Sequence, residues 1–187
     1  LIWNSRPDSE ERIPVAGPDA AALAAGLDRL AAMAFSIRGV DGALESDVGD
    51  AAHPVRIASV TSGFFDVLGS PAALGRTFEP ADGPGGAGVG GGDPVAASVV
   101  LADGVWQRAF AADPGVVGRS LRINGFPARV VGVIPPDFHL ALPPDAGVMT
   151  EVDVWVPLTV PLTAFHREPD RLLDQDSDNT GMVVARL

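Results

Sequence analysis

The segment from Val95 to Phe138 constrains the fold of this chain most, because nearly every residue in it has an evident structural role. Val95–Leu101 is an apolar run of strand length. Asp103 follows where a helix N-cap is expected, since its carboxylate can accept hydrogen bonds from the free amides of a first turn. Three apolar side chains then recur at about helical spacing, namely Val105, Trp106 and Phe110. The pattern predicts a buried strand that leads into a short helix, with Trp106 as the best core candidate.

The second half of this segment predicts a β-hairpin. Asp113-Pro114 combines a capping side chain with a proline suited to a first helical position. Asn124-Gly125 separates two strand-like runs, Ser120–Ile123 and Ala128–Ile134, and this dipeptide tolerates the positive φ angles of a type I′ turn. Pro135-Pro136 should end the second strand, because proline has no backbone N–H to donate.

A longer helix and three strands are predicted closer to the N-terminus. Gly17-Pro18-Asp19 is a helix start, with the proline suited to the first helical position and the aspartate to the helix dipole. The apolar stripe of this helix consists of Leu23, Leu27, Leu30 and Met33. The strand candidates, separated by turn residues, are Phe35–Arg38, Leu44–Val48 and Val55–Val60.

A short helix is predicted after the last of these strands. Ser62 is expected to cap it and Gly69 to end it. Its apolar residues are Phe64, Phe65 and Leu68. Two similar tetrads, Gly75-Arg76-Thr77-Phe78 and Gly118-Arg119-Ser120-Leu121, are interpreted as glycine turns that enter strands. The mixture of helices and strands indicates the α+β class.

Three stretches in collinear order carry a family resemblance. Leu101–Phe138 reads LADGVWQRAFAADPGVVGRSLRINGFPARVVGVIPPDF, Val60–Phe78 reads VTSGFFDVLGSPAALGRTF, and Asp153–Val160 reads DVWVPLTV. All three resemble the MacB-like periplasmic core domain of FtsX-type ABC transporter permeases. The resemblance covers most of the chain, and it is weakest in the segments from Pro80 to Pro94 and from Leu140 to Glu151.

The resemblance implies a two-lobed extracytoplasmic core domain spanning residues 1–187. A larger α/β lobe would come from both chain ends, residues 1–66 with 158–187, and a smaller, inserted β-rich lobe from residues 67–157. In that family, transmembrane helices of the same chain tether the domain to the cell membrane. A separate or fused cytoplasmic nucleotide-binding domain hydrolyses ATP.

The function that this resemblance implies is mechanical. We expect a non-catalytic domain that transmits ATP-driven conformational change to a substrate or partner, in export or in lipid, lipoprotein or peptide handling. A homodimer is compatible with it, and the transported substrate stays open. No catalytic, cofactor-binding or metal-binding residue is expected.

Composition agrees with this reading. With 47% hydrophobic residues, 187 residues can bury a sizeable core. The formal charge of −11 disfavours nucleic acid and anionic lipid as partners, since both require a basic surface. The chain has no cysteine, which excludes disulfides and thiolate ligands. It contains no apolar run of about 18 residues. Because it opens at Leu1 without methionine and stops within an alternating strand at Leu187, we expect an excised domain. The resemblance implies that membrane spans lie outside it on both sides.

Two motifs resemble binding loops. Gly86–Gly91 satisfies G-x-G-x-x-G, but it precedes Asp93-Pro94 and a strand instead of opening a helix, so a surface loop is predicted there and no nucleotide site. Asp174–Asn179 has alternating carboxylates, but Asn179 stands at the glycine position of an EF-hand and Ala185 at the position of its last glutamate. A solvated turn is predicted there, with weak cation binding left open.

Single residues give little indication of chemistry. The histidines, His53, His139 and His166, lack the spacing of a zinc pair. The tryptophans, Trp3, Trp106 and Trp155, are expected in the core. Arg76, Arg108 and Arg119 could pair with buried carboxylates or anchor a partner, but arginines near turns more often end in water, and a structural role is expected for them. Two alternatives stay open: a secreted acidic hydrolase with clustered carboxylates in a cleft, and a stand-alone module that binds a small ligand in an apolar cavity.

Overall fold

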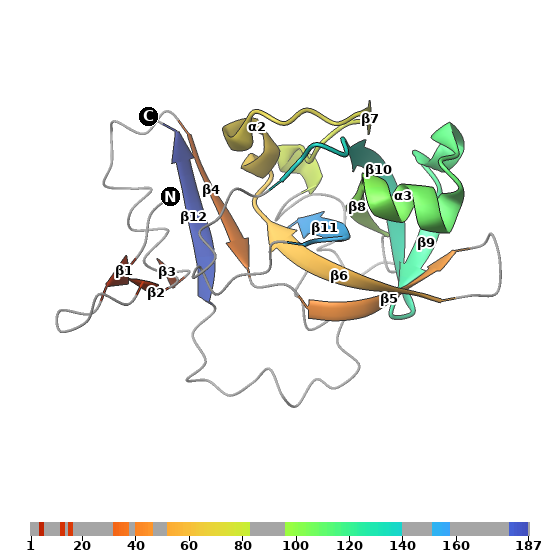
Figure 1. Cartoon of the computed structure of the whole chain (residues 1–187), viewed down its shortest axis with the longest axis horizontal. Coiled ribbons are helices and arrows are strands. Elements are labelled where there is room, and N and C mark those ends of the chain that lie inside the picture. The colour runs from red at the N-terminus through yellow and green to blue at the C-terminus, as the bar shows by residue number, and fades with distance from the viewer. Residues whose placement is uncertain are drawn as a thin grey trace.

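The computed structural model describes residues 40–46, 52–82, 96–139 and 151–157 with their side chains. It also describes the backbone of strands at 4–5, 12–13, 15–16, 32–37 and 180–186. These parts form a mixed α and β domain that is mostly strand (Figure 1).

Six strands close into a barrel-like sheet. They are β5 (Val40–Ser46), β6 (His53–Val60), β8 (Ala97–Ala102), β9 (Ser120–Ile123), β10 (Phe126–Ile134) and β11 (Val154–Pro157). Each pairs with two of the others, in the order β11-β8-β10-β9-β5-β6 and back to β11. The pairs β11–β6 and β8–β10 are parallel, and the other four are antiparallel. Closure leaves these strands without a long free edge.

The barrel interior is filled by the inward-facing residues of its strands. The members that are at most 5% exposed include Leu44, Val55, Ile57, Val99, Leu101, Leu121, Ile123, Val130, Val154 and Val156. Helix α3 (Asp103–Phe110) adds Val105, Ala109 and Phe110 to the same core. Burying one such aliphatic side chain contributes about 1.5 to 3 kcal/mol. The barrel is therefore a packed core and not a channel.

A second core lies on the outer face of the barrel, under helix α2 (Phe64–Leu68). Its fully buried members are Phe64, Phe65, Val60 and Val100, and Trp155 is 3% exposed. The burial pattern of β6 shows the effect of this cover: Arg56 is exposed between buried Val55 and Ile57, whereas every residue from Ile57 to Val60 is buried. Strand β6 is thus buried on both faces where α2 packs on it, and on one face before that point.

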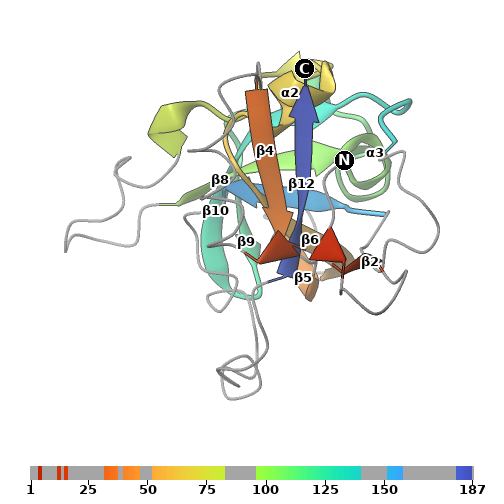
Figure 2. The same ribbon diagram turned by 90° about the vertical axis from the view of Figure 1, so that its left-hand side faces the viewer.

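The sheet continues beyond the barrel. Strand β4 (Ala32–Ile37) pairs with β6 at one position, Ser36 opposite Val60, and β12 (Thr180–Arg186) pairs antiparallel with β4. Figure 2 shows β4 and β12 side by side with α2 at their upper end, and α2 contacts both. The remaining strands are the edge strand β3 (Val15–Ala16) on β12 and the separate pair β1 (Asn4–Ser5) and β2 (Arg12–Ile13).

One glycine pair lets a short strand cross the barrel at close range. Strand β7 (Leu74–Gly75) pairs with β10, with Gly75 opposite Gly132. A Cβ on Gly132 would lie 2.1 Å from the carbonyl oxygen of Arg76, and one on Gly75 would lie 2.3 Å from that of Val131. Gly75 also has φ of 68°, which glycine adopts without strain. Close backbone contact therefore requires glycine at both positions.

Several sequence predictions are confirmed in detail. The hairpin turns at Asn124 and Gly125, with φ of 51° and 84°, and β10 ends at Ile134, directly before the two prolines. Asp113 caps the 3₁₀ turn η2 (Pro114–Val116), because its Oδ1 accepts from the amide of Gly115 at 2.8 Å. Gly69 ends α2 in the left-handed conformation, with φ of 67°.

Other predictions are corrected. Ala102 is the N-cap of α3, because β8 runs directly into the helix, and Asp103 is the first helical residue. Gly63, not Ser62, is the N-cap of α2, and neither helix has a side-chain cap.

The glycine tetrads and the N-terminal helix also differ from the predictions. The second tetrad enters β9 as expected, since the strand begins at Ser120, but Gly75 ends strand β7 instead of entering a strand. Met33 belongs to strand β4 and not to the predicted helix. The rest of that helix lies outside the described residues.

Candidate functional site

Among the residues that the structure describes, a groove of about 490 Å³ lies at one end of the barrel and is open along one side. It is formed where β8 leads into α3, where β10 leaves the sheet, and where the chain approaches β11. Its polar lining residues are Asp103, Arg108, His139, Glu151 and Asp153. Its larger apolar ones are Ile134, Pro135, Pro136, Phe138, Val152 and Trp155. The groove is thus polar and apolar in similar measure.

Asp153 connects the strands that meet at this groove. Its amide donates to the carbonyl of Arg56 at 2.9 Å, and its own carbonyl accepts from the amide of Ala102 at 2.9 Å. Its carboxylate accepts from the Arg56 amide at 2.9 Å and from Nη2 of Arg108 at 2.7 Å. Arg56 also pairs with Glu151, through Nη1 and Oε2 at 2.5 Å. These bonds hold the start of β11 between β6 and β8, where the barrel closes.

The apolar side of the groove belongs to an aromatic cluster. The ring of Trp155 stands edge-on to Phe65 and Phe138, with centroids 5.5 and 5.6 Å apart, and Phe138 lies 5.7 Å from Phe65. Such edge-to-face pairs contribute about 0.5 to 1.5 kcal/mol beyond their burial. The indole nitrogen of Trp155 is buried and has no hydrogen-bond partner in the structure. An unpaired buried donor is uncommon, because it loses its bond to water without replacement.

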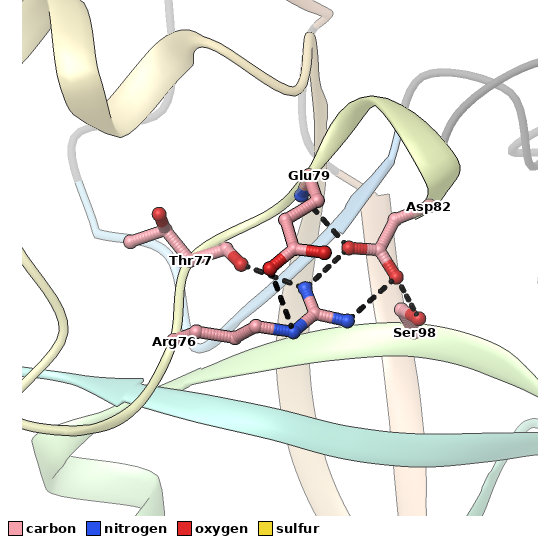
Figure 3. Close-up of polar contacts among 5 residues, drawn as sticks. All are labelled: Arg76, Thr77, Glu79, Asp82 and Ser98. Carbon is pink, nitrogen blue, oxygen red and sulfur yellow. Dashed lines mark hydrogen bonds and ion pairs between the residues drawn. The ribbon is translucent and has the colours of Figure 1, made fainter.

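A separate polar cluster surrounds Asp82 (Figure 3). Its carboxylate accepts from Nη1 and Nη2 of Arg76 at 2.5 and 3.2 Å, from the Glu79 amide at 2.8 Å and from the Ser98 hydroxyl at 2.6 Å. The Asp82 side chain is only 7% exposed. The cluster joins the segment after β7 and the 3₁₀ turn η1 (Pro80–Asp82) to the start of β8.

The ionisation of this cluster follows from its geometry. Burial alone raises the pKa of the Asp82 carboxyl, but hydrogen bonds from Arg76, the Glu79 amide and Ser98, with the charge of Arg76, lower it by more. The net pKa of Asp82 is therefore below its usual value. The hydrogen bond to Asp82 raises the pKa of Arg76, and burial opposes this only in part. Asp82 and Arg76 are both held in their charged forms.

Comparisons with known proteins agree with the fold described above. The family model for the MacB-like periplasmic core domain matches residues 2–186. The chain belongs to this family. The comparison with curated proteins gives no match.

Two solved structures resemble this MacB-like domain. The periplasmic region of MacB from Actinobacillus actinomycetemcomitans aligns with a TM-score of 0.59 and 16% identity, over 99% of this chain and 71% of the other. The extracellular domain of the noncanonic ABC-type transporter YknZ from Gram-positive bacteria aligns with a TM-score of 0.56 and 16% identity, over 92% and 73%. At this identity the likeness shows the fold.

The family membership determines what kind of domain this is. It is a periplasmic or extracellular domain of a MacB/FtsX-type ABC transporter permease, and the family has no catalytic activity of its own. Membership implies association with the membrane and ATPase parts of a transporter. In the described part of the MacB-like domain, no helix is both long and apolar enough to cross a bilayer.

All three arginines form ion pairs, which agrees with the structural role expected for them but not with side chains that end in water. Arg76 binds Asp82, Arg108 binds Asp153, and Arg119 binds Asp113 at 2.8 Å. Each carboxylate partner lies on a neighbouring turn or strand that folding brings close, and only Asp82 is nearly buried. No sequence spacing identified Asp82 or Asp153. Asp82 connects the segment after β7 to β8, and Asp153 connects β6 to α3, and neither contact follows from a local pattern.

The tryptophan prediction is confirmed for Trp155 and corrected for Trp106. Trp155 is 3% exposed. Trp106 is only partly buried, because its indole N–H donates to the Asp113 carbonyl at 2.8 Å near the surface. Trp3 lies outside the residues with described side chains.

The other candidate sites are placed only in part. His53 begins β6 and His139 is exposed at the groove. His166, Gly86–Gly91 and Asp174–Asn179 lie outside the described residues. Among the described side chains, no group of three or more His, Cys, Asp or Glu residues could hold a metal ion.

Proposed function

We propose that this domain transmits ATP-driven conformational change from the membrane part of its permease to a substrate or partner outside the membrane. The observation that carries the proposal is the continuity of the sheet, which runs from β12 through β4 and β6 into the closed barrel. A packed, closed barrel moves as a unit, because its interior cannot deform without opening voids.

The connection between the β4–β12 pair and the barrel is narrow. In the part of the chain that the structure describes, it is formed by the β4–β6 pairing at Ser36 and Val60 together with helix α2, which contacts β4 and β12. The Phe64 and Phe65 side chains of α2 are fully buried on the barrel. Displacement of β12 would therefore reach the barrel through α2 and β6.

In this proposal the domain has no ATPase activity. A separate or fused cytoplasmic domain hydrolyses ATP, and flanking transmembrane helices of the same chain connect it to this domain, which lies on the extracytoplasmic side of the cell membrane. The process is export or the handling of lipids, lipoproteins or peptides, and two copies of the permease would pair. The division into lobes of residues 1–66 with 158–187 and 67–157 stays a prediction.

A secreted acidic hydrolase is the weaker alternative. Clustered acids of raised pKa in a cleft would favour it. The described carboxyl whose pKa is clearly displaced is Asp82, which is shifted downward by an ion pair and does not line the groove. A stand-alone ligand-binding module is also less well supported, because the groove is open and the barrel interior is filled.

The test follows the barrel relative to the bilayer. Arg129 is exposed on β10, and the chain has no cysteine, so Arg129→Cys gives one labelling site within this domain. The full permease, freed of other cysteines and assembled with its ATPase in nanodiscs, is labelled with a donor dye, and the acceptor is placed on lipid headgroups. We expect energy transfer to change on addition of ATP and vanadate.

Two controls make this result specific. An ATPase variant that cannot bind ATP should show no change. A donor and acceptor pair at Asp41→Cys and Arg129→Cys, both exposed on barrel strands, should keep its distance in all states. If energy transfer to the headgroups stays the same in every nucleotide state while transport proceeds, the mechanical role is refuted.

A further inference from the structure

We propose that the groove at the barrel end binds an extended basic segment of a partner protein, in which an arginine or lysine stands beside an apolar residue. This goes beyond the mechanical role and holds whether or not the barrel moves with ATP. Four features of the groove support it: its net negative charge, its apolar side, its open shape and its rigid frame.

The charge of the lining fits a cationic side chain. Among the described residues, Asp103, Glu151, Asp153 and Arg108 are the acidic and arginine side chains that line the groove. Oδ2 of Asp103 accepts from Nε2 of Gln107 at 2.5 Å. Arg108 and the Arg56 amide bind the two carboxylate oxygens of Asp153, so this residue is already satisfied. Glu151 is 82% exposed in its side chain and uses one oxygen for Arg56, which leaves the other available. Three carboxylates and one guanidinium give the described lining a formal charge of −2 with His139 neutral (−3 + 1), so the groove favours a cationic side chain over an anionic one.

The opposite side of the groove suits an apolar side chain. Ile134 and Trp155 are buried in the outer core, and Phe138 and Val152 are partly buried against them. The edge-to-face contact of Phe138 with Trp155 gives this side a defined shape. Aromatic residues with one free face are typical anchors of protein interfaces.

The shape favours a polypeptide over a small molecule. Pockets for small ligands enclose most of the ligand surface, whereas this groove is open along one side, so a chain can enter and leave it. A polypeptide also brings main-chain carbonyls, which are hydrogen-bond acceptors. Trp155 lines the groove and has a buried indole N–H without a partner in the structure. A small amine would supply the charge but no acceptor. Because the N–H is buried, its bond to a carbonyl requires the Trp155 ring to turn.

The groove is held in shape before any partner binds. The main chains of Ala102 and Arg56 both bond to Asp153 at 2.9 Å, and the Phe138 amide donates to the carbonyl of Pro135 at 3.1 Å. These bonds fix the three chain segments that form the walls. A preorganised groove loses little conformational entropy on binding, which favours even a short segment.

The test uses a defined peptide and the 187-residue chain labelled with ¹⁵N. The probe is Ac-Ala-Leu-Arg-Phe-Ala-NH2, and the matched control replaces its arginine by glutamate. We expect amide shifts at the groove, at Gly104, His139 and Val152, a shift of the Trp155 indole resonance, and a dissociation constant below about 1 mM. Higher salt should weaken binding, since the charges are exposed. The glutamate peptide should bind at least about tenfold more weakly.

Charge variants of the protein make the assignment specific. Asp103→Asn with Glu151→Gln should weaken the arginine peptide at least about fivefold, because the two changes remove two negative charges from the groove, that of the half-buried Asp103 and that of the exposed Glu151. Asp137→Asn is the matched control: Asp137 is exposed and adjacent to Phe138 in sequence, but it does not line the groove. Its affinity should stay within about twofold.

Three results would overturn the proposal. One is equal binding of the glutamate peptide, and another is a set of shifts that lies away from the groove. The third is binding of phenethylamine as tightly as the peptide, which would make the groove a site for small organic cations. Because no nucleotide or membrane is present, none of these results bears on the mechanical role.

Discussion

Asp82 shows how much one side chain can connect. Its carboxylate binds the side chains of Arg76 and Ser98 and the amide of Glu79, and it is only 7% exposed. Removing one partner of a nearly buried ion pair leaves the other without compensation, which is far more destabilising than the loss of a surface pair. Arg76 is 41% exposed, so water recovers part of the loss.

We predict that Asp82→Ala lowers the free energy of unfolding by about 2 kcal/mol. Urea unfolding at pH 7 measures it. Glu151→Ala is the control: it also breaks an arginine pair, but its side chain is 82% exposed, so the expected loss is below about 0.5 kcal/mol. Equal losses in the two variants would show that burial of Asp82 has no energetic role.

The same carboxylate predicts a pH dependence. The pKa of Asp82 is lower in the folded chain than in the unfolded chain, where an aspartate has a pKa of about 3.9. Its contribution to stability is therefore complete above the unfolded pKa and is lost as the pH falls through the folded pKa. The gap in unfolding free energy between the parent chain and Asp82→Asn should be constant from about pH 5 to 7 and should narrow below about pH 4. A gap that widens on acidification would contradict the assigned shift.

At the scale of elements, the crossing of β7 and β10 depends on the lack of a side chain. A Cβ on Gly132 would lie 2.1 Å from the Arg76 carbonyl oxygen and 2.9 Å from that of Leu74. Both neighbours are main-chain atoms of the segment that Asp82 holds in place, so neither can move aside cheaply. The crossing also lies beside the register shift between β10 and β8, at Val130 and Gly132.

We predict that Gly132→Ala destabilises the domain by more than about 3 kcal/mol or prevents folding. Thermal unfolding followed by circular dichroism measures it. Gly104→Ala is the matched control, because a Cβ there meets only Nη1 of Arg108, at 3.6 Å, within helix α3. Alanine is the better helix former, so this variant should be neutral or up to about 1 kcal/mol more stable. A tolerated Gly132→Ala would mean that β7 detaches from β10 without loss.

At the scale of the whole molecule, the barrel and the β4–β12 pair should differ in local stability. Each barrel strand pairs on both sides around a filled core, whereas β4 meets the barrel at a single position, Ser36 opposite Val60. Amides of a closed, packed unit exchange with solvent only when the whole unit opens.

We predict that amides of β8 and β10, such as those of Val99 and Val130, exchange through global unfolding. Those of β4 and β12 should open at a free energy lower by at least about 2 kcal/mol. Native-state hydrogen exchange at increasing urea concentrations measures both. The same slow exchange in β12 as in β10 would show that the sheet opens as one cooperative unit, and the narrow connection would then have no mechanical consequence.

Sequence by itself determined the local structure, because each signal acts over a few residues. Asn124-Gly125 specified the hairpin turn through its backbone preference. Asp113 specified the N-cap of η2, because its carboxylate binds an amide only two residues further on. Gly69 specified the end of α2. The sequence also indicated the family, because three motifs occur in the order found in the family, and the family model matches residues 2–186. The exact caps of α2 and α3 were missed, because the strand or turn before each helix displaced them.

Only the tertiary structure decided the barrel and the groove. The β11–β6 pair, which closes the barrel, aligns Val154 with Ile57, almost a hundred residues away in the sequence. The alternation of apolar residues along a strand predicts which face of that strand is buried, but not which strand lies next to it. Arg108 and Asp153 meet for the same reason, and so do Ser98 and Asp82, whereas Arg76 and Asp82 meet through the local turn at η1. Long-range pairings depend on the joint packing of all six strands, so no local pattern could specify them.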